Sequence, residues 1–77
     1  AVLLLAEPQA LVTLDGAPQH HGPLSLVAGP ERIESGWWDG RPVTRDYYVA
    51  RNPQSEICWV FRDYRQQRRW YLHGYFA

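Results

Sequence analysis

The alternation of apolar and polar positions is clearest in the last third of the chain. The stretch EICWVFRD, at residues 56–63, places Ile57, Trp59 and Phe61 at every second position. Successive side chains of a strand point to opposite faces, so a period of two predicts a strand here. A helix over residues 56–69 is the competing prediction. It is disfavoured because the segment lacks helix-capping residues.

The same alternation continues in RWYLHGYF, at residues 69–76, and divides both segments into two sides. We expect the side with more apolar area to form the core, because burial gains about 25 cal/mol per Å². That side carries Ile57, Trp59, Phe61, Trp70, Leu72 and Phe76. The opposite side is expected to be half exposed and partly aromatic. It carries Cys58, Val60, Arg62, Tyr71, His73 and Tyr75.

Glycine and proline divide the rest of the chain into short segments, which favours strands and turns. AVLLL is typical of a first strand, and Asp15-Gly16 of a two-residue hairpin turn, in which both positions tolerate positive φ. Gly29-Pro30 is expected to break the chain before ERIESGWW. The sequence therefore predicts an all-β fold, a small antiparallel meander or partly closed barrel of about six strands. We expect one domain over residues 1–77, in which residues 1–22 form a less tightly packed lead-in strand and hairpin.

Composition supports a small packed domain. The 77 residues include four Trp, five Tyr and two Phe, whose large side chains help a short chain to build a core. The formal net charge is zero and all eight basic residues are Arg, which argues against a broad phosphate-binding surface. Cys58 is the single cysteine and excludes an internal disulfide, so we expect a reducing, cytoplasmic location.

The amino-terminal residues predict neither a signal peptide nor a membrane anchor. AVLLLAEP has no basic region before its apolar run, and the run ends at Glu7 and Pro8. No apolar run approaches the roughly 20 residues of a membrane span. The chain does not begin with Met, and we therefore expect it to be a piece of a longer protein.

The sequence shows no pattern typical of a catalytic or metal site. His20, His21, Cys58 and His73 lack the paired spacing of zinc ligands, and a thiol inside an apolar run is usually inert. The carboxylates are scattered over predicted turns and strand ends, and no glycine-rich phosphate loop is present. We expect no catalytic residue, no metal and no cofactor, and hence a protein that is not an enzyme.

A family resemblance rests on four stretches between residue 23 and residue 77. GPERIESGWWDG, RDYYVA, WVFRD and the ending RWYLHGYFA together resemble the carboxyl-terminal segment of the ImuB family. These proteins are relatives of Y-family DNA polymerases, found in damage-induced mutagenesis cassettes. The resemblance implies a role in translesion DNA synthesis without catalysis, as a hub for a RecA-like accessory protein and an error-prone replicative-type polymerase. It also implies at most an indirect association with DNA.

The clamp-binding peptide of that family lies upstream of the matched segment. QALVTL, at residues 9–14, is faintly similar to such a peptide but lacks its Leu-Phe ending, so a strand is the better interpretation.

Two binding hypotheses follow for the half-exposed side. In the first, aromatic side chains dock partner proteins, because Tyr and Trp are enriched at interfaces. The residues expected to do so are Trp38, Tyr48, Tyr71, His73 and Tyr75. In the second, the same rings stack on the bases of single-stranded or primed DNA while arginines follow the backbone. The arginines expected to do so are Arg62, Arg68 and Arg69.

Overall fold

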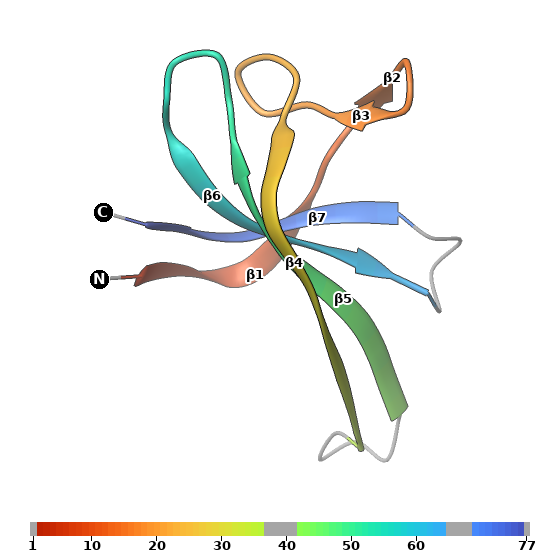
Figure 1. The fold of residues 1–77 in the computed structure, drawn as a ribbon. Coiled ribbons are helices and arrows are strands. Elements are labelled where there is room, and N and C mark those ends of the chain that lie inside the picture. Colours follow the sequence, from red (N-terminus) through yellow and green to blue (C-terminus); the bar gives the residue numbers. More distant parts are fainter. Residues whose placement is uncertain (1, 37–41, 65–68, 77) are drawn as a thin grey trace.

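The computed structural model describes residues 2–36, 42–64 and 69–76, which form seven strands and no helix. The strands are β1 Val2–Ala10, β2 Thr13–Leu14, β3 Ala17–Pro18, β4 Ser25–Gly36, β5 Pro42–Arg51, β6 Ile57–Asp63 and β7 Arg69–Phe76. Five of them form one antiparallel sheet in the order β1-β7-β6-β5-β4, and β2 pairs with β3 (Figure 1). The predicted all-β meander is confirmed, since β4 to β7 are consecutive neighbours. The sheet is not a closed barrel, and its strand direction turns markedly from β1 to β4 (Figure 1).

The predicted turn at Asp15-Gly16 is confirmed. Both residues have positive φ, 50° and 80°, as a two-residue turn between β2 and β3 requires. The expected break at Gly29-Pro30 is wrong, because β4 continues through it with two shifts in its register against β5. Gly29 permits this course. Its φ is 113°, and a Cβ there would lie 2.7 Å from the carbonyl oxygen of Tyr47.

The main core lies on one face of the sheet, where the segment that carries β2 and β3 packs Leu11 and Leu24 against it. Its buried members are Leu24, Ala50, Cys58, Val60, Trp70 and Leu72, with Leu5, Leu11, Tyr48 and Tyr75 packed around them. Residues 9–14, the weak clamp-peptide candidate, comprise the end of β1, the whole of β2 and the link between them. The interpretation of this stretch as strand agrees with the structure.

The predicted sides of β6 are reversed. Cys58 and Val60, expected to be half exposed, have no accessible surface and form the main core. Trp59 and Phe61 lie on the opposite face, where Phe61 is buried and Trp59 is half-buried. The reason is that apolar area alone does not decide which face another segment covers, and the small side chains of β6 fit beneath that segment. The predicted burial of Trp70 and Leu72 is confirmed, whereas Phe76 is 37% exposed.

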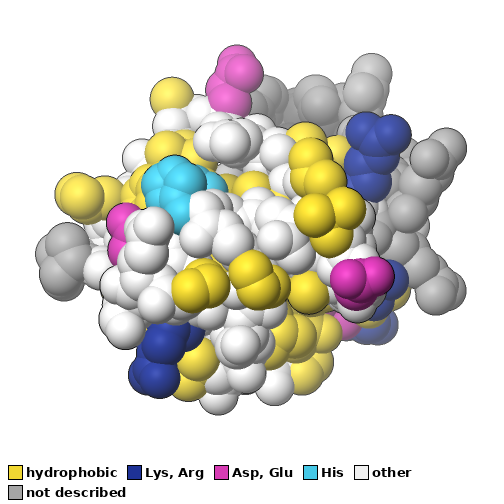
Figure 2. Space-filling model, turned by 90° about the horizontal axis from the view of Figure 1, so that it is seen from above, with side chains coloured by type: hydrophobic (Ala, Val, Ile, Leu, Met, Phe, Trp, Pro, Cys, Tyr) yellow, Lys and Arg dark blue, Asp and Glu magenta, His cyan; other side chains and the backbone are white. Residues whose placement is uncertain are grey.

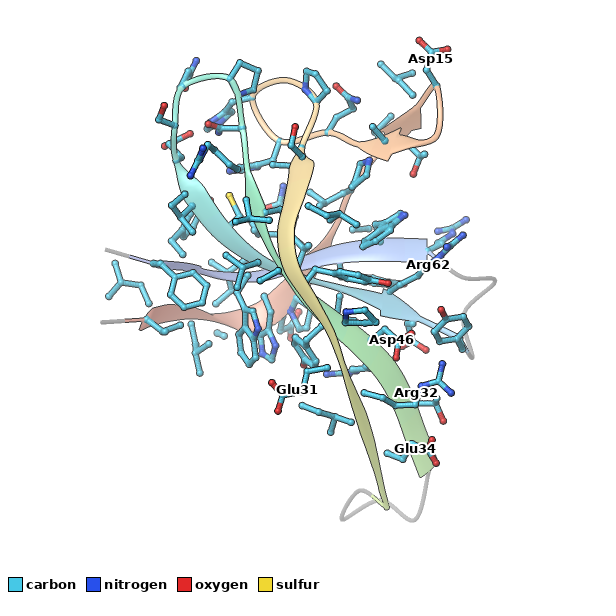
Figure 3. The ribbon with its side chains drawn as sticks, viewed as in Figure 1. Asp15, Glu31, Arg32, Glu34, Asp46 and Arg62 are labelled. Carbon is cyan, nitrogen blue, oxygen red and sulfur yellow. The ribbon has the colours of Figure 1, made fainter. Side chains whose placement is uncertain are left out.

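An ion pair fastens β4 to β5 on the core side. Arg32 donates from Nε to Oδ1 of Asp46 at 2.8 Å and from Nη2 to Oδ2 at 3.2 Å (Figure 3). Asp46 is 4% exposed, and the hydrogen bonds from Arg32 lower the pKa of its carboxyl. The two residues are also opposite each other in the strand register, so the pair stabilises the alignment of these strands.

Within the described ranges the chain is entirely strand, turn and loop. None of these ranges contains a helix long and apolar enough to span a membrane.

Candidate interaction surface

The face of the sheet opposite the main core carries a group of stacked rings from three adjacent strands. We call it the aromatic face. It consists of Tyr47, Trp59, Phe61, Tyr71 and His73, with Arg45 at its edge. The strand register produces it, because Tyr47 is opposite Phe61 and Phe61 is opposite Tyr71. Directly opposite residues of antiparallel strands share a face, so these three rings form a row across β5, β6 and β7.

Trp59 stacks on Tyr47 of this row and also on His73. Its ring stacks on Tyr47 at 4.3 Å between centroids and on His73 at 5.1 Å, where the two ring planes differ by 5°. Phe61 stacks on Tyr71 at 5.2 Å. Such ring pairs contribute stability in addition to that gained by burying their apolar area, and they hold each ring in a fixed orientation.

β7 contains a bulge at His73. Trp59 is opposite Gly74 and Val60 is opposite Leu72, so His73 has no partner residue on β6. His73 shares the face of Tyr71, two positions before it, and the bulge reverses the sides of the residues that follow. The His73 ring stacks on Trp59, and its Nδ1 is 2.9 Å from the hydroxyl oxygen of Tyr47.

Arg45 contacts the rings and extends the hydrogen bonding between Tyr47 and His73. Its guanidinium lies 4.4 Å from the centroid of Phe61 and donates from Nη1 to the Tyr47 hydroxyl oxygen at 3.2 Å. With that oxygen accepting from Arg45, the Tyr47 hydroxyl hydrogen can be donated to Nδ1 of His73. Burial and then the charge of Arg45 lower the pKa of His73. The ring is therefore neutral at neutral pH and can receive that hydrogen bond.

The aromatic face is only partly buried. Tyr47 and Phe61 are 5% and 1% exposed, whereas Trp59, Tyr71 and His73 are half-buried and remain partly accessible to solvent. Beside it is a hollow of about 120 Å³. The hollow is lined by Ala28, Gly29, Glu31, Tyr47, Tyr48, Val49 and Trp59. The rings and the hollow share Tyr47 and Trp59, so a partner seated on the rings can also reach β4.

The five residues predicted to dock partners do not share one face. Tyr71 and His73 lie on the aromatic face, whereas Tyr48 and Tyr75 pack against the main core. Trp38 lies outside the described residues. The physical reason is the bulge, because one extra residue in β7 moves Tyr75 to the side opposite Tyr71. The binding role of these residues stays a prediction.

Sequence reasoning missed Arg45, Tyr47, Trp59 and Phe61 as members of a surface. The apolar area of Trp59 and Phe61 predicts a core position for both. Tyr47 and Tyr48 are adjacent, and alternation alone does not tell which of them faces the covering segment. Gly74 was the available signal, since a glycine inside a strand pattern is typical of a bulge.

The arginines of the second hypothesis are also divided. Arg62 is opposite Trp70 on the core side, with its guanidinium 5.5 Å from the Trp70 ring centroid. Arg69 is exposed at the start of β7 and is opposite Asp63, on the side of Tyr71. Arg68 lies outside the described residues. Arg62 and Arg69 thus do not form one continuous basic strip.

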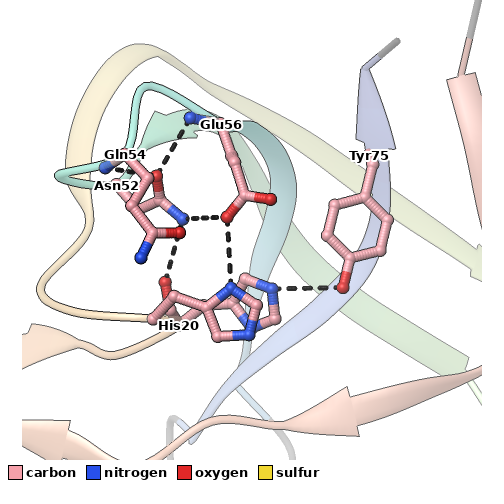
Figure 4. Close-up of polar contacts among 6 residues, drawn as sticks. His20, Asn52, Gln54, Glu56 and Tyr75 are labelled. Carbon is pink, nitrogen blue, oxygen red and sulfur yellow. Dashed lines mark hydrogen bonds and ion pairs between the residues drawn. The ribbon is translucent and has the colours of Figure 1, made fainter.

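A second polar cluster ties the β5–β6 turn to the segment that covers the core (Figure 4). Asn52, 3% exposed, donates from Nδ2 to the carbonyl oxygen of His20 and to Oε1 of Glu56. Its Oδ1 accepts from the backbone N–H of Gln54 and of Glu56. Nε2 of His20 is 3.1 Å from the Tyr75 hydroxyl. Every polar group named here has a partner, which indicates a structural role.

The described residues contain no group of three His, Cys, Asp or Glu side chains placed to hold a metal ion. Cys58 is fully buried, and burial raises the pKa of its thiol. It lies on the core face, away from His73 on the aromatic face. The absence of a metal site and of a catalytic nucleophile stays a prediction.

Comparison of the chain with protein-family models, with curated proteins and with solved structures gave no match in any of the three.

Proposed function

We propose that this chain is a non-catalytic protein-interaction domain that docks partner proteins through the aromatic face. The observation that carries the proposal is the set of half-buried rings of Trp59, Tyr71 and His73, held in place by stacking. Partly exposed, rigid aromatic side chains next to an arginine are typical of the anchor residues of interfaces.

The resemblance to the ImuB family supports a particular setting for this surface. In that setting the domain belongs to a cytoplasmic hub for error-prone translesion synthesis. Its partners are the RecA-like accessory protein and the error-prone replicative-type polymerase of the cassette. A contact surface without catalytic groups suits a protein that assembles other enzymes.

The test is a binding measurement between the chain and each of these two proteins in purified form. Tyr71→Ala should weaken binding about tenfold or more, because truncating an interface anchor removes its buried contact area. Leu14→Ala is the matched control, since Leu14 is 58% exposed on β2, away from the aromatic face. The proposal fails if neither protein binds, or if Tyr71→Ala binds as tightly as the unmodified chain.

Binding of single-stranded or primed DNA is the second candidate function. It is favoured by one observation, the exposed Arg69 on the same side of β7 as Tyr71. Bases could stack on the half-buried rings while Arg69 contacts a phosphate. A titration with single-stranded DNA at low salt would then show binding that weakens steeply as salt rises. Absence of binding at low salt removes this candidate.

A further inference from the structure

The first half of β1 is an edge strand without the protection that edge strands usually have. β1 pairs with β7 alone among the described strands, which leaves its other edge open. Val2, Leu3 and Leu4 are 44%, 60% and 60% exposed, and residues 2–6 include no charge and no proline. An exposed apolar edge of this kind is a template for pairing with another strand. The segment that can serve as a template is residues 2–6. It ends there because Glu7 and Pro8 follow and because the register against β7 shifts after Leu4.

The opposite edge of the sheet differs. β4 carries Glu31, Arg32 and Glu34 in its carboxyl-terminal half (Figure 3). Its pairing with β5 is interrupted by two register shifts. Charges and bulges are the devices that keep strand edges from pairing. The contrast between the two edges singles out β1.

Other exposed apolar residues form less continuous templates. On the opposite edge strand, Leu26 and Val27 are 47% and 52% exposed, but two register shifts interrupt β4 between Leu26 and Glu31. Val12 and Leu14 are 66% and 58% exposed, but β2 has two residues, which pair with β3. Seen from the end that carries β2 and β3, hydrophobic side chains are spread among polar ones (Figure 2). Scattered exposed apolar side chains are common on protein surfaces.

We propose that β1 pairs, antiparallel, with β1 of a second copy of this chain, and so joins two sheets edge to edge. In an antiparallel pair, two residues directly opposite each other both point their N–H and C=O groups toward the partner strand or both point them away. Neighbouring residues of one strand point these groups in opposite directions. A two-fold pairing therefore places one residue opposite itself, either Leu3 or Leu4. With Leu3 on the axis, Leu3 meets Leu3 on one face, and Val2 meets Leu4 on the other.

Three features favour a second copy over an unrelated peptide. The segment is already extended in the folded chain, so pairing does not require a disordered strand to be ordered first. It is uncharged, so two copies meet without repulsion. Phe76, 37% exposed and opposite Val2 on β7, extends the apolar contact.

The interface is small. Pairing of four or five residues on each side buries far less than the roughly 1,600 Å² of a standard interface, so the dimer should be weak and concentration-dependent. This site lies on the sheet edge, and its test is independent of binding at the aromatic face.

The experiment is sedimentation velocity on the 77-residue chain from about 10 µM to about 1 mM, a range suited to weak association. We expect a reversible dimer. The double variant Leu3→Lys, Leu4→Lys should weaken it more than about tenfold, because like charges then face each other across the axis. Val12→Lys, Leu14→Lys is the matched control, with the same charge change at similar exposure, and should still dimerise.

A chain that stays monomeric throughout this range overturns the proposal, as does a dimer that survives in the β1 variant or is lost in the control. A second measurement covers the case in which the β1 variant does not fold. The single variants Leu3→Cys and Leu4→Cys are oxidised under mild conditions, with Leu14→Cys as control. The proposal requires a cross-linked dimer at Leu3 or Leu4 that forms faster than at Leu14, and equal rates at all three contradict it.

Discussion

Leu72 and Tyr71 show, one residue apart, how the two faces of the sheet differ. Leu72 has no accessible surface and packs in the main core, whereas Tyr71 is half-buried and stacks on Phe61. Replacing the first creates a cavity, and replacing the second removes surface contacts. The same separation between stability and binding should hold for each residue of the aromatic face that is partly accessible to solvent.

Leu72→Ala should lower the free energy of unfolding by about 2–5 kcal/mol, because the cavity it leaves lies among fully buried side chains. Tyr71→Ala should lower it by about 1–2 kcal/mol, chiefly through the lost stack on Phe61. Chemical denaturation of both variants measures the difference. Equal losses would contradict the assignment of these residues to two different faces.

His73 gives the aromatic face a pH dependence. Its folded-state pKa is lowered from the ordinary 6.5, by burial and then by Arg45. Between the folded value and 6.5 the unfolded chain binds more protons. The free energy of unfolding should therefore fall as pH drops below about 6.5, and it should fall less in His73→Gln. Burial also lowers the pKa of His20, which keeps part of the dependence in that variant.

The titration of His73 can be followed directly by NMR of its ring. We expect a midpoint below 6.5 in the unmodified chain and a midpoint closer to 6.5 in Arg45→Gln, since that change removes the nearby positive charge. A midpoint above 6.5 in the unmodified chain would contradict the described surroundings of His73.

At the scale of the element, the bulge in β7 decides which side chains reach which face. Alternation predicted strands for EICWVFRD and for the last eight described residues, and the Asp15-Gly16 turn followed from its residue types. Alternation cannot show an extra residue in one strand, so it predicts Tyr75 on the same side as Tyr71. Nor can it show that the segment between β1 and β4 covers Cys58 and Val60, because that contact is long-range in sequence.

At Gly74 the backbone of β1 lies close to β7. A Cβ on Gly74 would lie 2.5 Å from the carbonyl oxygen of Leu3, a backbone atom that cannot move without disturbing the strand pairing. Gly74→Ala should therefore destabilise the fold by about 1–3 kcal/mol. Gly16→Ala is the comparison, since nothing lies within 4 Å there and only its φ of 80° opposes the change. Thermal unfolding that shows no loss in Gly74→Ala would contradict this close approach.

At the scale of the whole molecule, the five-stranded sheet has one face that the chain itself covers and a second face that is left for contact with a partner. The segment that contains β2 and β3 packs on the first face and is held to the β5–β6 turn by Asn52 and His20. The second face is the aromatic face, whose rings stack on one another across β5, β6 and β7. Interaction through that second face is the claim on which the proposed function depends.

The most direct measurement is an NMR titration of the isotope-labelled chain with the RecA-like accessory protein and with the error-prone polymerase. Docking at the aromatic face predicts that signals of Trp59, Tyr71 and His73 shift or broaden with one of them, while those of Cys58 and Leu72 change little. Unchanged spectra with both proteins, or changes confined to the core face, would contradict it.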